Sequence, residues 1–143
     1  MTTPHEPYQD LDAPQAWQFL SEHRVGRLAI VIGGEPDIFP VNYVVDDRSI
    51  IFRTAEGSKL FAVSLGGRMA FHVDEWTHEG AVSVLAHGTP RRLEGAEADA
   101  AATLGLEPWV PTLKENWIRL EVDEVAGRRF VFGPQPDDFH PVG

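Results

Sequence analysis

The chain has 143 residues, of which 43% are hydrophobic and 24% charged, and this length and composition suit one compact domain with a single core. Its formal net charge is −10 and its longest basic runs are pairs of arginines, which argues against a nucleic-acid partner because phosphate contacts need clustered Lys and Arg. No cysteine is present, so disulfides and thiol catalysis are excluded, and no apolar run approaches the ~20 residues that span a bilayer. We therefore expect a cytoplasmic protein that binds neither nucleic acid nor membrane.

The first half of the chain predicts one helix followed by an antiparallel meander. Asp12 is a suitable N-cap, Pro14 is tolerated in a first helical turn, and the apolar stripe behind them extends the predicted helix to about His23. β-rich runs follow at 27–32 and 38–45, separated by a Gly-Gly turn, and a third strand is predicted at 50–54.

The second half predicts more strands with short helices between them. Helices are expected at 58–65 and 97–102, strands at 69–73, 82–88, 117–122 and 129–132, and loops at 74–80 and 123–127. About seven strands without βαβ alternation favour a mainly β fold, a closed or partly closed antiparallel barrel with short flanking helices. We expect one domain over 1–143, with its core at about 11–132 and a flexible C-terminal tail.

The segment from Phe52 to Leu60 is the most informative part of the sequence for chemistry. A strand end presents Arg53 and Thr54, and a turn containing glycine then presents Ser58 and Lys59 at the start of a predicted helix. Unpaired backbone N–H groups, a hydroxyl and an ammonium together suit a phosphate. The alternative is that Ser58 only caps the helix and Lys59, one of two lysines in the chain, is a solvated surface charge.

The histidines do not indicate a metal site. His72 and Asp74 are two apart on a predicted strand and share a face, and His87 on the neighbouring strand is a conceivable third ligand. Half-buried strand histidines are more often structural, so we expect no metal. There is also no Ser-His-Asp or paired-carboxylate signature.

Several short motifs taken together resemble a known family. In chain order they are Gly26-Arg27-Leu28-Ala29, Pro40-Val41-Asn42-Tyr43, Phe52-Arg53-Thr54 with Gly57-Ser58-Lys59-Leu60, Phe71-His72-Val73-Asp74, and Gly80-Ala81-Val82-Ser83-Val84 with Gly88. Their order and spacing resemble the pyridoxamine 5′-phosphate oxidase-like split-barrel superfamily, especially its small actinobacterial-type branch with nitroimidazole-resistance-like proteins. The resemblance covers about residues 11 to 132.

The resemblance implies a flavin-reductase-like split β-barrel and a set of cofactor contacts. Arg53, Thr54, Ser58 and Lys59 would hold the flavin phosphate and part of the ring, and Asn42 and Tyr43 would lie beside the ring. Ser83 would meet the isoalloxazine, and Trp76 would be a stacking partner or lid. The alternative for Trp76 is an ordinary, partly buried aromatic side chain.

The function implied by the resemblance is a homodimeric oxidoreductase that depends on flavin mononucleotide (FMN), with the flavin at the subunit boundary and a small-molecule substrate. The flavin supplies the hydride chemistry, so no catalytic side chain is required. Alternatives are a deazaflavin-dependent reductase, or a non-enzymatic flavin- or haem-binding protein with His72 or His87 as an axial ligand. The Arg and His pattern that holds substrate phosphate in authentic pyridoxamine 5′-phosphate oxidases is missing after Trp117, so conversion of that substrate is not expected.

Overall fold

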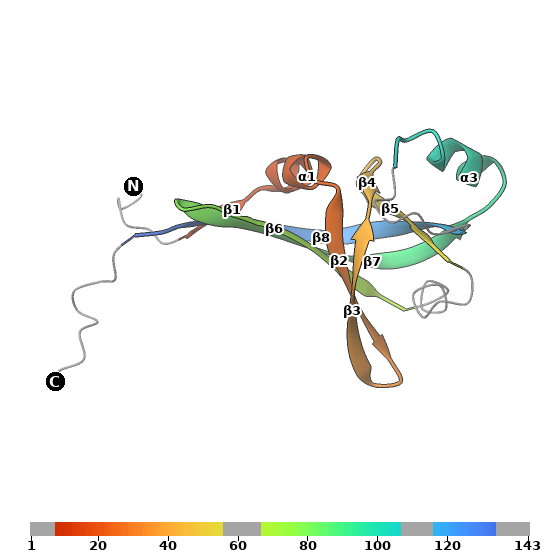
Figure 1. The fold of residues 1–143 in the computed structure, drawn as a ribbon, viewed down its shortest axis with the longest axis horizontal. Helices are drawn as coiled ribbons and strands as arrows, with labels where there is room; N and C mark the ends of the chain where they lie inside the picture. The colour runs from red at the N-terminus through yellow and green to blue at the C-terminus, as the bar shows by residue number, and fades with distance from the viewer. Residues whose placement is uncertain (1–7, 56–66, 107–115, 134–143) are drawn as a thin grey trace.

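A curled antiparallel sheet forms most of the protein (Figure 1). The computed structural model describes residues 8–55, 67–106 and 116–133. The sheet order is β3-β2-β6-β7-β8-β5-β4, and β1 pairs with β8 beyond the end of β5. The elements are β1 Tyr8–Leu11, α1 Ala13–Ser21, β2 Val25–Ile32, β3 Glu35–Asn42, β4 Val44–Val45, β5 Ser49–Thr54, β6 Met69–Trp76, β7 Gly80–Leu93, α3 Ala96–Ala101 and β8 Asn116–Val131. No helix in these described ranges is long and apolar enough to cross a membrane.

Helix α1 begins as predicted. The Asp12 carboxylate accepts a hydrogen bond from the Gln15 backbone N–H at 2.8 Å, and the Gln15 side chain accepts one from the Asp12 N–H at 2.9 Å, which completes a capping box. Its buried residues, Ala16, Phe19 and Leu20, pack on the sheet. Figure 1 shows α1 over one part of the sheet and α3 at the opposite end.

The hairpin of β2 and β3 follows from alternation and turn chemistry. Buried and exposed residues alternate along β2, and Gly33 and Gly34 both take positive φ in the connecting turn. Strand β3 lies at the end of the sheet order, where its two prolines remove no needed ladder hydrogen bond. The predicted strand 38–45 is interrupted at Tyr43, because its side chain turns into the core between β3 and β4.

The predicted loop 74–80 is shorter than expected, and the predicted loop 123–127 is wrong because a strand continues through it. Strand β6 runs on to Trp76, and a tight turn held by the Thr77 hydroxyl, which accepts from the N–H groups of Glu79 and Gly80, leads into β7. The predicted strands 117–122 and 129–132 are one strand, β8, because the intervening residues pair with β7. Asp123 is the extra residue of a bulge there, since His87 pairs with Glu124 and Gly88 with Val122.

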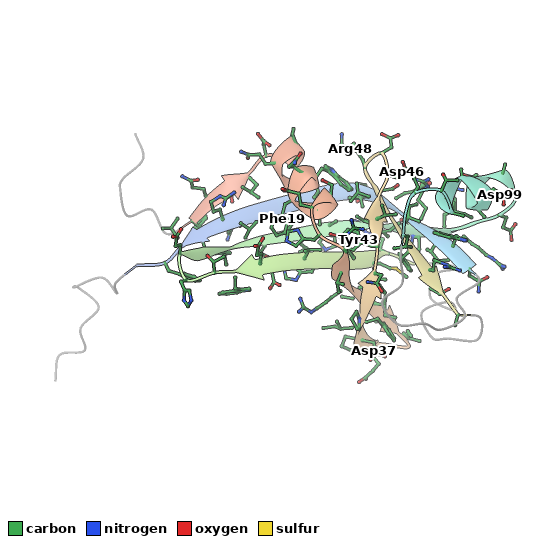
Figure 2. All side chains as sticks on the ribbon, turned by 45° about the horizontal axis from the view of Figure 1, so that its top comes forward. Phe19, Asp37, Tyr43, Asp46, Arg48 and Asp99 are labelled. Atoms are coloured by element: carbon green, nitrogen blue, oxygen red, sulfur yellow. The ribbon has the colours of Figure 1, made fainter. Side chains whose placement is uncertain are left out.

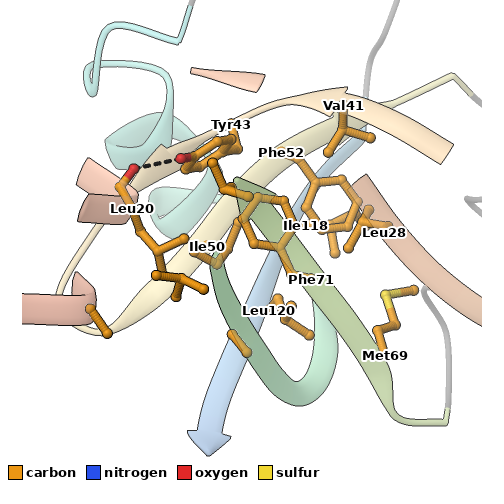
Figure 3. Close-up of a cluster of buried hydrophobic side chains, with 14 of the residues drawn as sticks. Leu20, Leu28, Val41, Tyr43, Ile50, Phe52, Met69, Phe71, Ile118 and Leu120 are labelled. Carbon is orange, nitrogen blue, oxygen red and sulfur yellow. Dashed lines mark hydrogen bonds between the residues drawn. The ribbon is translucent and has the colours of Figure 1, made fainter. Parts of the chain in front are cut away.

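The curled sheet closes around one main core (Figure 3). Leu28, Phe52, Phe71, Ile118 and Leu120 are fully buried and come from strands spread across the sheet. A smaller cluster of Ile51, Leu93 and Ala101 lies under α3. The predicted split β-barrel is therefore confirmed. The predicted helix at 58–65 and most of the predicted tail lie outside the described residues.

Candidate functional site

The end of β5 places a cation and a buried hydroxyl on opposite sides of one strand. The Arg53 guanidinium lies over the Trp117 ring, 4.8 Å from its centroid, and Trp117 is the Cα partner of Arg53 on β8. Thr54 points toward the core side and is 2% exposed. Its hydroxyl has no hydrogen-bond partner within residues 8–55, 67–106 and 116–133, although the Asn116 amide donates to the Thr54 carbonyl at 3.5 Å. A buried hydroxyl without a partner is unfavourable, so the Thr54 hydroxyl could still form a hydrogen bond with a polar group from outside these residue ranges.

Ser58 and Lys59 lie outside the described residues, and so does the Gly57 turn before them. Their predicted phosphate contacts stay predictions. The structure does show that the chain leaves β5 at Arg53 and Thr54 only a few residues before them.

A second polar group lies on what we call the outer face, the side of β2, β3, β6 and β7 turned away from the main core. The outer face carries Arg27, Asn42, His72, Asp74 and Ser83, because residues directly opposite one another in antiparallel pairs share a face. His72 Nε2 lies 2.8 Å from the Ser83 hydroxyl oxygen. Within the described part of the chain, no three His, Cys, Asp or Glu residues are placed to hold a metal ion.

Asp74 organises the charged side of this group. Its carboxylate accepts hydrogen bonds from the Trp76 indole at 3.0 Å and from Arg27 at 3.4 Å. The hydrogen bond from Trp76, with smaller contributions from the nearby charges of His72 and Arg27, holds the pKa of Asp74 below its ordinary value. Asp74 therefore stays ionised on this face at neutral pH.

Trp76 is an exposed aromatic side chain at the end of β6. It is 67% exposed, so it is not an ordinary, partly buried core aromatic. Its ring stacks on Phe132 with centroids 5.8 Å apart and an interplanar angle of 30°. Because its indole N–H donates to Asp74, Trp76 exposes a ring of fixed orientation to solvent, which suits stacking on a planar ligand.

Asn42 and Tyr43 are neighbours in sequence but point in different directions. Asn42 is half-buried on the outer face opposite Val25, at the last residue of β3. The Tyr43 side chain is 2% exposed, packs edge-on against Phe71, and donates to the Leu20 carbonyl at 2.5 Å (Figures 2 and 3). Burial raises the pKa of Tyr43 well above its ordinary value. A cofactor contact at Tyr43 stays a prediction, and its side chain is structural in any case.

The structure does not bring all predicted site residues together in one chain. On β7, the Cα partner of Trp76 is Ala81. Arg53 is the Cα partner of Trp117 on β8, and Trp117 in turn pairs with Leu93 of β7. The twelve residue-to-residue steps from Ala81 to Leu93 correspond to about 40 Å along the strand, more than the length of an FMN molecule. Arg53 and Thr54 therefore lie far from Ser83 and Trp76 along the same sheet.

Four surface hollows of the described residues do not coincide with either group. They range from about 340 Å³, beside the turn from β6 to β7, to about 490 Å³, between Ala13 and His87. None of the four is lined by Arg53, Thr54 or Ser83. The candidate site is thus defined by its polar side chains rather than by a cavity of the single chain.

Sequence reasoning missed the link between His72 and Ser83 and the one between Arg27 and Asp74. The alternation along β6 places His72 and Asp74 on one face, but the sequence does not say which residues of β2 and β7 lie opposite them. Register supplies those partners, and register is visible only in the folded sheet.

Comparison with known proteins agrees with this architecture. The family model described as pyridoxamine 5′-phosphate oxidase matches residues 12–129. A crystal structure of a candidate pyridoxamine 5′-phosphate oxidase from Corynebacterium glutamicum is 37% identical, with a TM-score of 0.82 over 93% of this chain and 100% of that one. The FAD-binding protein of Mycobacterium smegmatis is 34% identical, with a TM-score of 0.79 over 87% of this chain and 100% of that one. An uncharacterized Mycobacterium tuberculosis protein is 37% identical over 66% of this chain and 86% of its own length. The chain belongs to the pyridoxamine 5′-phosphate oxidase family and has its split-barrel fold.

Proposed function

We propose that this protein is a homodimeric flavoprotein that binds FMN and acts as an oxidoreductase on a small molecule. Family membership and similarity to a protein that binds FAD support a flavin. The observation that carries the proposal is the buried Thr54 hydroxyl next to Arg53, which has no hydrogen-bond partner within residues 8–55, 67–106 and 116–133 and lies at the strand end that precedes Ser58 and Lys59.

The donor set at this strand end fits a flavin phosphate. A dianionic phosphate in a chain of net charge −10 needs local cations and directed donors, and Arg53 with Lys59 would supply the cations. The Ser58 hydroxyl would donate to the phosphate on the side of Arg53, whereas the Thr54 hydroxyl, on the other side of the strand, would donate to the ribityl chain. When bound, the flavin supplies hydride transfer. The chain's own residues bind it, orient it and exclude water from it.

The alternatives are separated by an absorption spectrum. The proposed haem ligands are engaged in this structure, His72 with the Ser83 hydroxyl and His87 facing Glu124 at 3.7 Å. Freshly purified protein, with no cofactor added, should therefore show flavin bands rather than a Soret band or a deazaflavin band. Parallel titration with FMN and FAD decides which flavin binds more tightly.

The test of the phosphate site is equilibrium titration of the apoprotein with FMN. Lys59→Ala and Arg53→Ala should each remove a charge-assisted contact of roughly 1.5–3 kcal/mol, which is about 10- to 150-fold in affinity. Arg48→Asn is the control, because it removes one positive charge at the other end of β5, on the turn seen in Figure 2, where asparagine tolerates the positive φ of 61°. Unchanged affinity in both Lys59→Ala and Arg53→Ala would refute the site.

The separation of the two polar groups supports a dimer. A two-fold arrangement of two chains with outer faces together would place the Ser83 end of one beside the Arg53 end of the other. The outer face carries large exposed apolar side chains, Val31 at 65%, Ile38 at 67% and Leu85 at 38%, which a second copy would cover. Light scattering should give twice 15.9 kDa, and a clean monomer in the FMN-loaded sample would contradict the proposal.

A further inference from the structure

His72 and Ser83 make a direct side-chain contact on the outer face, and the proposed flavin chemistry does not use His72. Both side chains are half-buried, on the adjacent strands β6 and β7. The distance of 2.8 Å between Nε2 and the hydroxyl oxygen is that of a normal hydrogen bond.

The protonation state of the imidazole decides what the hydroxyl can offer to a third group. A protonated imidazole carries a hydrogen on both nitrogens, so Nε2 must donate to the Ser83 oxygen, and the hydroxyl hydrogen is then free to point elsewhere. A neutral imidazole has two tautomers, and in one of them the Ser83 hydroxyl donates to Nε2 and has no hydrogen left for a ligand.

The strands around the pair contribute both charged and apolar neighbours. Arg27 on β2 is the Cα partner of His72, and its guanidinium is neutralised by Asp74 at 3.4 Å. Asp74 on β6 itself is kept ionised by its hydrogen bonds. On β7, the exposed apolar side chain of Leu85 is the Cα partner of His72. On β8, beyond Ser83, Arg128 is directed to Asp10 at 3.4 Å.

We propose that His72 is a positioning residue for Ser83: when protonated, it fixes the Ser83 hydroxyl as an outward donor to a hydrogen-bond acceptor on the edge of the flavin ring. This inference rests on the proposed function, because Ser83 is the expected ring contact. It adds that flavin affinity depends on pH between about 5 and 8, the range in which histidine side chains change charge. FMN binds more tightly at the acidic end of this range, because there His72 is protonated and the Ser83 hydroxyl of every chain is free to donate to the flavin.

The experiment is FMN titration of the full-length protein from pH 5.5 to pH 8. The wild type should lose roughly 3- to 10-fold in affinity over this range beyond any change due to ionisation of the FMN phosphate, as expected for one hydrogen bond. His72→Gln should remove that extra pH dependence, because a glutamine amide can donate to Ser83 but does not ionise. Ser83→Ala should bind FMN more weakly than the wild type and should show no extra pH dependence, whereas Ser83→Thr should retain that pH dependence. The double variant His72→Gln/Ser83→Ala should bind FMN no more weakly than Ser83→Ala alone.

Calorimetry supplies a second readout that needs no enzyme activity. Comparing binding enthalpies in two buffers of different ionisation enthalpy gives the number of protons taken up when FMN binds at pH 7. The wild type should take up more protons than His72→Gln. Protons taken up by the FMN phosphate are the same for both proteins and cancel in this comparison. His87→Gln is the matched control, because His87 lies on β7 next to Glu124 and does not touch Ser83. It should behave as the wild type does.

The outcomes separate this inference from the proposed function. If the wild type binds FMN and Lys59→Ala weakens binding, but His72→Gln keeps the wild-type pH profile and proton uptake, the role of His72 is wrong and the flavin site stands. If the wild type binds no flavin at any pH, the proposed function itself fails.

Discussion

Two buried hydroxyls show how individual residues divide between fold and function. The Tyr43 hydroxyl is satisfied by the Leu20 carbonyl inside the core, whereas the Thr54 hydroxyl has no partner in the described part of the chain. A buried hydroxyl without a partner costs about 1–3 kcal/mol relative to a satisfied one. We therefore assign Tyr43 to stability and propose that Thr54 serves ligand binding.

This assignment predicts opposite effects of two conservative substitutions. Thr54→Val keeps the shape and removes the unsatisfied hydroxyl, so the apoprotein should become more stable by up to about 1 kcal/mol while FMN affinity falls. Tyr43→Phe removes a satisfied hydrogen bond, so it should destabilise the apoprotein by about 0.5–1.5 kcal/mol and leave FMN affinity within about two-fold. Thermal unfolding with and without FMN measures both. A Thr54→Val protein that is less stable and binds FMN normally would show that the hydroxyl has a structural partner.

Element boundaries were predictable where local chemistry decides them. The N-cap at Asp12 and the turn at Gly33 and Gly34 are local, and both were predicted from the sequence. The single long β8 was not, because its polar middle looks like a loop until pairing with β7 and β1 is known. The division of Asn42 and Tyr43 between two faces also depends on where β3 ends, which tertiary packing decides.

The bulge between β7 and β8 gives a prediction at this scale. A Cβ on Gly88 would meet the Glu121 carbonyl oxygen closer than real Cβ contacts allow, with Val122 Cα at 3.0 Å. Gly88→Ala should therefore destabilise the protein by about 1–3 kcal/mol in denaturant unfolding, since the obstacle is backbone and cannot rotate away. Gly133→Ala is the control, because nothing described lies within 4 Å of that position. Equal stability of the two variants would mean that the bulge relaxes freely.

At the scale of the whole molecule, the sheet separates residues that the sequence motifs bring together. The motifs indicated a common site for Arg53, Thr54, Ser83 and Trp76, but sequence spacing does not reveal that β7 and β8 are long enough to hold the two pairs far apart. In our proposal the common site forms between two chains, where the Arg53 end of one chain lies beside the Ser83 end of the other. The motifs of a single chain do not indicate this pairing.

Two of the three arginines of β8 are engaged within the protein, and this predicts inactivity toward pyridoxamine 5′-phosphate. Arg119 is held by Asp46 at 2.9 Å and by the Ser49 hydroxyl at 2.5 Å, and Arg128 by Asp10 and the Tyr8 ring. Because Arg119 and Arg128 already have these partners, neither guanidinium is free to bind a substrate phosphate beside the flavin. Anaerobic mixing of the FMN-loaded protein with pyridoxamine 5′-phosphate should leave the flavin absorbance unbleached, whereas a chemical reductant should bleach it. Bleaching by pyridoxamine 5′-phosphate at a catalytic rate would show that a substrate site exists.

The central claim is that one flavin site is built from two chains, and mixed dimers test it most directly. A tagged chain carrying Arg53→Ala is paired with an untagged chain carrying Trp76→Ala, the mixed dimer is purified, and FMN is titrated against it. If each site joins the Arg53 end of one chain to the Trp76 end of the other, one site of the mixed dimer is fully wild type and the other carries both substitutions. We predict tight, wild-type binding of one FMN per mixed dimer, and weak binding to each parental homodimer. If each site lay within a single chain, every site would carry one substitution, and a mixed dimer without any tight site would contradict the account.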